Sequence, residues 1–148
     1  VGVTRASQVP TRWIDQGASH ARVLARTPHR GAAGKIEVAL KSVFTDRTSW
    51  QKMLKNNVIE SPDWATALAL ARVTIPESHR EYIVEDADIV SMNYPVISYP
   101  EKVKSMSFDK APLISGKLMG IKGQYLLLDE NRVLNIRKHN GYDLRFEA

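Results

Sequence analysis

The spacing of apolar residues changes part way along the chain, and this change constrains the fold more than any other feature. Within residues 35–44 the apolar side chains recur at helical spacing, and the alanine-rich run over 64–73 has the composition of a helix. From Met92 onward, short apolar runs alternate with turn residues, which is typical of a small sheet or barrel. We therefore predict an α+β fold. A lobe of helices with a short sheet spans residues 1–76, and a small antiparallel β lobe, sheet-like or barrel-like, spans residues 77–148.

Local start and stop signals place the expected elements. Pro10 suits the first turn of a short helix, and Ser61 followed by Pro62 suits the N-cap and first turn of another. Thr48 and Gln51 have the spacing of a capping box. The expected elements are strands over 1–5 and 21–26, a loop over 27–34, helices over 10–15, 35–44, 48–55 and from Ser61 to before Pro76, and turns at 120–123, 129–131 and 139–141.

The charge is unevenly distributed. The 148 residues contain 21 Lys and Arg against 16 Asp and Glu, a formal net charge of +5. Residues 1–56 hold 10 basic and 3 acidic side chains, residues 57–111 hold 5 and 9, and residues 112–148 hold 6 and 4. A polyanion such as nucleic acid would be attracted to the first third. The alternative is a mildly basic surface that only keeps the protein soluble.

Several classes of protein are disfavoured by what the sequence lacks. It has no cysteine, so this chain offers no disulfide, no thiolate metal site and no cysteine nucleophile. No apolar stretch approaches the roughly 18 to 20 residues of a membrane-spanning helix, so we expect no membrane partner. The missing cysteines fit a reducing compartment, and we expect a cytoplasmic protein.

Three long and unusual strings carry a family resemblance. They are VGVTRASQVPTRWIDQGAS, VALKSVFTDRTSWQKML and GIKGQYLLLDENRVLNIRKHNGYDL. Through them, most of the chain resembles an uncharacterised bacterial family, the domain-of-unknown-function family numbered 2797. Members of that family usually carry a cysteine-rich, zinc-binding segment before this region. The resemblance therefore implies no zinc site within this chain. With Val1 in place of an initiating Met, it leads us to expect a fragment of a longer protein.

The first third also resembles, more distantly, the GIY-YIG nuclease superfamily. Val1 to Thr4 look like the end of that fold's second strand. Arg12 falls on the first helix, where the superfamily's arginine lies, and Glu37 falls on the helix that carries its metal-binding glutamate. Trp50 is placed like a tryptophan of the phage-type branch. The superfamily's first strand, with its tyrosine, is absent, and its late asparagine has no convincing match.

This second resemblance implies hydrolysis of a phosphodiester with one Mg²⁺ ion. Glu37 would be the metal ligand, since a single helical carboxylate suits an ion that keeps most of its waters. Arg12 would clamp the phosphate with bidentate geometry. The alternative for Glu37 is a surface ion pair with Lys41, four residues later. The alternative for Arg12 is a structural salt bridge near Asp15 or stacking on an aromatic ring.

Other residues could extend the contact with nucleic acid. Those in the first third would track phosphates, and those near the end would lie on a small sheet beside tyrosines, with solvated basic surface as the alternative. We expect Tyr125 in the core. Residues 135–142 are either a charged edge strand or, through Arg137 and Lys138, part of the contact with nucleic acid. Trp13, Trp50 and Trp64 are expected in the core rather than on bases. His29 is a candidate general base. The candidate nucleic-acid contacts are Arg5, Arg22, Arg26, Arg30, Lys35, Lys41, Arg137 and Lys138.

The sequence thus predicts a nucleic-acid-binding protein, and in its catalytic form a Mg²⁺-dependent endonuclease of the GIY-YIG type. The alternative is a module that keeps the fold without the chemistry and binds RNA or a protein partner. A structural role for the β lobe is a third interpretation. Likeness of fold does not decide among these, because function resides in the site.

Overall fold

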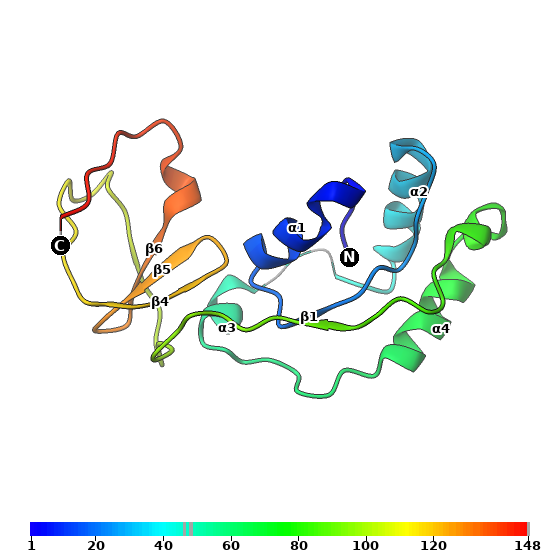
Figure 1. Cartoon of the computed structure of the whole chain (residues 1–148), viewed down its shortest axis with the longest axis horizontal. Helices are drawn as coiled ribbons and strands as arrows, with labels where there is room; N and C mark the ends of the chain where they lie inside the picture. Colours follow the sequence, from blue (N-terminus) through cyan, green and yellow to red (C-terminus); the bar gives the residue numbers. More distant parts are fainter. Residues whose placement is uncertain (46, 48, 148) are drawn as a thin grey trace.

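The computed structural model describes residues 1–45, 47 and 49–147, and it shows a mixed α+β protein (Figure 1). Helices dominate the first half and strands the second, as the apolar spacing predicted. Among the described residues, no helix has the length and apolar character that crossing a membrane would require. The helices are α1 (Val9–Asp15), α2 (Arg30–Leu40), α3 (Trp50–Leu54) and α4 (Trp64–Thr74), with 3₁₀ turns η1 (Ala6–Gln8), η2 (Glu77–Tyr82) and η3 (Ile136–His139). The strands are β1 (His20–Ala21), β2 (Val90–Ser91), β3 (Lys104–Met106), β4 (Leu118–Lys122), β5 (Tyr125–Leu128) and β6 (Arg132–Asn135).

Helices α2 and α4 pack against each other at one end of the molecule (Figure 1). Ile36 and Leu40 from α2 meet Ala71 and Ile75 from the end of α4, and all four are buried. Their spacing of four residues on each helix places them on one face, so the helical periodicity becomes a core.

One extended segment, residues 82–97, joins the two ends of the molecule. Its first part runs antiparallel to residues 20–26, through the β1–β2 pair and a bridge between Ala25 and Ile83. Its last part forms an antiparallel bridge between Val96 and Gly120 of β4. A Cβ at Gly120 would lie 2.6 Å from the Val96 Cα, so only glycine allows this close approach.

The larger sheet has the order β3-β6-β5-β4 and lies at the other end (Figure 1). Glu130 and Asn131 both have positive φ, as a tight β5–β6 turn requires, so the predicted turn at 129–131 is confirmed. The turn of residues 120–123 is confirmed at its Gly123 end, where φ is +59°, although Gly120 itself lies in β4.

The sheet differs from the predicted antiparallel lobe in one pairing. Strand β3 pairs parallel with β6, whereas β4–β5 and β5–β6 are antiparallel. The chain between β3 and β6, which includes β4 and β5, is long enough for the crossover that a parallel pair needs. The predicted edge strand over 135–142 is also wrong. Strand β6 lies inside the sheet, and the chain then turns into η3.

Helix α3 belongs to the core of this sheet. Met53 and Leu54 are buried with Leu127 and Val133, and the Trp50 ring stacks on Tyr125 at 5.9 Å between centroids. The predicted core roles of Trp50 and Tyr125 are confirmed. Since α3 precedes residue 76, tertiary packing joins a segment of the first half to the sheet, and the division at residues 76 and 77 stays a prediction.

Two predicted helix starts are shifted, and the predicted strand over 1–5 is wrong. Of the predicted strand over 21–26, only Ala21 lies in β1, with an isolated bridge at Ala25, and α2 takes up residues 30–34 of the predicted loop. Helix α2 begins at Arg30 rather than residue 35, because His29 Nδ1 accepts a hydrogen bond from the Ala32 N–H at 3.2 Å. Helix α4 is capped by Asp63 rather than Ser61. Among the described residues, 1–5 pair with no strand, and the Val1 amino group donates to the Thr45 carbonyl. Residue 48 of the predicted capping box lies outside the described residues.

Candidate nucleic-acid interface

An ion pair between the first helix and the last 3₁₀ turn brings distant basic residues together. Arg137 Nη1 of η3 lies 3.4 Å from Asp15 Oδ2 at the end of α1. Arg12 lies three residues before Asp15, on the same face of α1. Two segments from opposite ends of the sequence, which the sequence predicts in two separate lobes, therefore lie on one surface.

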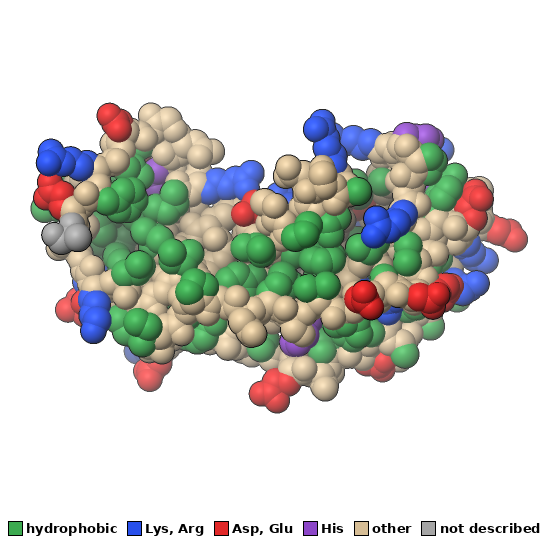
Figure 2. Space-filling view, in the orientation of Figure 1, with side chains coloured by type: hydrophobic (Ala, Val, Ile, Leu, Met, Phe, Trp, Pro, Cys, Tyr) green, Lys and Arg blue, Asp and Glu red, His purple; other side chains and the backbone are tan. Residues whose placement is uncertain are grey.

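This surface carries positive charge on both sides of the ion pair. Arg5, Arg12, Arg137 and Lys138 are exposed, and we call these four residues the basic junction. Figure 2 shows Lys and Arg side chains on both sides of a hollow at the upper edge of the molecule. Asp15 offsets one of the charges, and the remaining cations face solvent.

The other predicted contacts lie on or near α2. Arg26, Arg30, Lys35 and Lys41 are exposed, so they are accessible to a ligand. Arg22 is half-buried and donates from Nη2 to the Glu85 carbonyl at 2.8 Å. Its guanidinium thus already holds the extended segment that joins the two ends of the molecule.

The predicted metal ligand Glu37 is half-buried on α2. Within the ranges that the structure describes, no three His, Cys, Asp or Glu side chains form a group suited to a metal ion. A Mg²⁺ ion held by one carboxylate takes its other ligands from water and from substrate phosphates. The described residues therefore fit the ion only together with a bound phosphate.

Two of the four histidines, His29 and His139, make structural hydrogen bonds. His29, the candidate general base, uses Nδ1 to cap α2. His139 is buried, and its Nε2 accepts from the Phe108 N–H at 3.1 Å. Its Nδ1 therefore carries the proton and donates to the Asn135 carbonyl at 2.9 Å. The lone pair that a base would need is already occupied in both.

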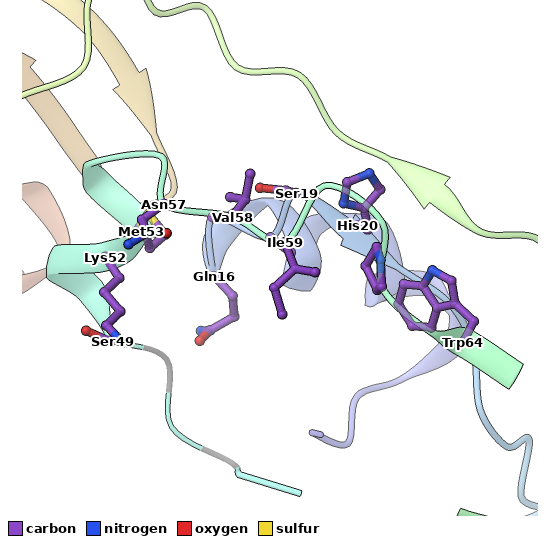
Figure 3. A pocket seen from close by; sticks show the side chains of 13 residues that line it. Gln16, Ser19, His20, Ser49, Lys52, Met53, Asn57, Val58, Ile59 and Trp64 are labelled. Atoms are coloured by element: carbon purple, nitrogen blue, oxygen red, sulfur yellow. The ribbon is translucent and has the colours of Figure 1, made fainter. Parts of the chain in front are cut away.

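Two adjoining cavities around α3 were not expected from the sequence. The first, of about 340 Å³, opens below the end of α1 and reaches to the start of α4 (Figure 3). The second, of about 440 Å³, shares Ser49, Lys52 and Asn57 with the first. Lys52 and Lys55 lie three residues apart, which was a usable signal for one charged helix face. We name the two cavities together the α3 groove.

Close packing fixes the floor of the α3 groove. Gly17 has φ +66°, and a Cβ there would lie 2.4 Å from the Met53 Sδ. The positive φ favours glycine at residue 17, and a larger residue there would also force the Met53 side chain to move. Gly17 and Met53 both line the first cavity.

A buried lysine connects β4 to the chain that follows α3. Lys122 of β4 is fully buried and donates from Nζ to Asn56 Oδ1 at 2.8 Å. Its ammonium also lies 5.3 Å from the Tyr94 ring centroid and 5.1 Å from that of Tyr99. Burial lowers the pKa of Lys122 and raises that of Tyr94 to about 12.

The fold and these surfaces define a class: a small α+β protein in which a helix pair and a mixed sheet are joined by one extended segment, with an exposed basic junction. The chain belongs to the family described as "Protein of unknown function (DUF2797)", which matches residues 1–144. This confirms the resemblance read from the three sequence strings. No curated protein and no solved structure shows a significant match to the chain.

Proposed function

We propose that this protein binds nucleic acid through the basic junction. The observation that carries the proposal is the Asp15–Arg137 ion pair, which joins cations of residues 5–12 to those of residues 137–138. Guanidinium groups suit phosphate oxygens because their donors form a planar fork. Figure 2 shows a hollow at the upper edge of the molecule with Lys and Arg side chains on both sides, which would offer a strand a concave surface.

A salt titration tests this proposal. We would measure fluorescence anisotropy of labelled single- and double-stranded DNA and RNA from about 50 to about 300 mM salt, where each phosphate contact contributes about one log unit of affinity per log unit of salt. We expect Arg12→Gln and Lys138→Gln each to weaken binding and to reduce the slope by about one. Affinity that does not change with salt would contradict the proposal.

Arg145→Gln is the matched control for these variants. Its side chain is 87% exposed and pairs with Glu147 in the C-terminal tail, so it removes the same charge away from the basic junction. We expect it to leave affinity and slope close to those of the parent. An equal loss from Arg145→Gln would mean that binding follows net charge rather than this surface.

The catalytic form of the proposal is a Mg²⁺-dependent endonuclease of the GIY-YIG type in a bacterial cytoplasm. It is supported by the resemblance at Arg12 and Glu37 and by the half-buried position of Glu37. The ion would polarise the scissile phosphate, Glu37 would hold it, and Arg12 would bind the phosphate. We expect Glu37→Gln to abolish cleavage while leaving binding nearly intact.

The non-catalytic alternative uses the same surface to bind RNA or a protein partner. Both forms of the proposal use the same exposed cations, Arg5, Arg12, Arg137 and Lys138, so only the cleavage assay separates them. Intact substrates in every reaction with Mg²⁺, together with salt-dependent binding, would establish this alternative. Cleavage by both the parent and Glu37→Gln would refute the assignment of Glu37.

A further inference from the structure

The α3 groove has chemically different ends. Figure 3 shows the rings of His20 and Trp64 at one end of the first cavity and Lys52 and Ser49 at the other, with Ile59 between them. Pro62 and Val58 add further apolar surface. One end is therefore a wall of rings and aliphatic groups, and the other end is polar.

The polar end of the groove is lined by two lysines. Among the described residues that line the two cavities, Lys52 and Lys55 carry formal charge, and none of the others is Asp or Glu. Both lysines are exposed, and Lys52 lies on α3 whereas Lys55 is its C-cap residue. An anionic group placed between them gains attraction and meets no opposing carboxylate.

Several polar side chains of the groove have no hydrogen-bond or ion-pair partner among the residues that the structure describes. In the described part of the chain, no hydrogen bond or ion pair involves the side chains of Gln16, Lys52 or Asn57, and the Ser49 side chain does not cap α3. Each amide offers both a donor and an acceptor. These groups are free to bind a ligand edge between the ring wall and the lysines.

We propose that the α3 groove binds a nucleotide. The base lies against Pro62 and Trp64, its polar edge meets Gln16 and Asn57, and its phosphate lies between Lys52 and Lys55. The first cavity, about 340 Å³, has the size of a small-ligand site. Stacking on an aromatic ring tolerates any base, because every base has a π face. This site goes beyond the basic junction, since none of the four junction residues lines either cavity.

The first arm of the test uses adenosine 5′-monophosphate and adenosine with the ¹⁵N-labelled chain. We expect the Trp64 indole N–H and the amides of residues 49–59 to shift with adenosine monophosphate. Adenosine, which lacks the phosphate, should bind at least about tenfold more weakly. Lys52→Gln should lower the affinity for the monophosphate to that for adenosine. Lys110 is an exposed lysine outside both cavities, so Lys110→Gln should leave both affinities unchanged.

The second arm separates a free nucleotide from a nucleotide within a strand. A short single-stranded oligonucleotide that binds more tightly than the monophosphate, and is weakened by Trp64→Ala and Lys52→Gln, indicates a strand. Tighter binding of the monophosphate indicates a free nucleotide. We expect Arg12→Gln to weaken binding of the oligonucleotide and to leave binding of the monophosphate unchanged. Failure of the basic junction is therefore distinguishable from failure of the groove.

Two results would overturn this proposal. The first is that no resonance of residues 49–59 or Trp64 shifts with either probe while the folded spectrum is kept. The second is that Lys52→Gln, which replaces an exposed side chain and leaves the core intact, binds the monophosphate as tightly as the parent.

Discussion

At the residue scale, Lys122 shows how one polar side chain is accommodated in a core. The ammonium has a hydrogen bond to Asn56 and two aromatic faces, which together replace part of its lost hydration. Tyr94 contributes one of those faces and donates its Oη–H to the Ala18 carbonyl at 2.8 Å. This cluster therefore ties β4, the end of α3 and the turn after α1 together.

The pKa of Tyr94 makes this cluster sensitive to alkaline pH. Burial, with a smaller effect of Tyr99, raises it from 10.0 to about 12, so the folded state keeps a proton that the unfolded state loses. The stabilisation is complete below pH 10 and is lost as pH rises to about 12. The lowered pKa of Lys122 has the opposite effect on stability. Just below pH 10.5 the folded state binds fewer protons at this lysine than the unfolded chain, so this contribution to stability rises with pH.

We predict that the stability gap between the parent and Tyr94→Phe narrows as pH rises from 10 to about 12. Urea unfolding at several pH values measures this gap. Titration of the other tyrosines is common to both proteins and cancels in the difference. A gap that stays constant over this range would show that the Tyr94 phenol titrates alike in the folded and unfolded states.

At the element scale, caps determine where the two packed helices begin. Asp63 Oδ1 accepts from the Thr66 N–H at 2.9 Å at the start of α4, and the His29 imidazole does the same for α2. The hydrogen bonds from Thr66 lower the pKa of Asp63. A carboxylate whose pKa is lowered on folding stabilises the fold above its ordinary value of 3.8 and loses that effect as pH falls.

We predict that Asp63→Ala lowers the melting temperature at neutral pH, because the Thr66 N–H loses its acceptor. Asp63→Asn is the control, since its amide oxygen still accepts this bond, and it should retain most of the stability. The difference between the parent and Asp63→Ala should shrink at acidic pH. Equal melting temperatures for Asp63→Ala and the parent at neutral pH would contradict a capping role.

At the scale of the whole molecule, two clusters of buried side chains share no residue. One holds Ile36, Leu40, Ala71 and Ile75, and the other holds Met53, Leu54, Leu127 and Val133. The extended segment over 82–97 pairs with elements of both. Separate cores favour local opening of one without the other.

We predict that Leu40→Ala costs about 2 to 5 kcal/mol locally, because it empties a fully buried site between α2 and α4. Native-state hydrogen exchange should show faster exchange in α2 and α4 and unchanged protection in β5 and β6. Leu54→Ala, the matched change in the other cluster, should produce the reverse pattern. Equal loss of protection throughout the chain would mean that the two clusters unfold as one unit.

Much of the local structure was predictable because its causes lie close together in the sequence. The helix after Pro10 is confirmed, and so is the turn at 129–131, where Glu130 and Asn131 adopt positive φ. Helix starts were less predictable, since several neighbouring side chains compete for the same backbone donors. Ser61 and Asp63 are both good caps, and only the observed hydrogen bond to Thr66 selects Asp63.

The sequence by itself determined the fold class, the change from helices to strands and the family, because periodicity and long unusual strings are properties of neighbouring residues. Tertiary structure alone decided the parallel β3–β6 pairing, the place of α3 in the sheet core and the meeting of Asp15 with Arg137. Tertiary structure alone also decided the α3 groove, since its walls come from the end of α1, from α3 and from the start of α4. Such features arise from packing between segments far apart in the chain, and no local pattern encodes that packing.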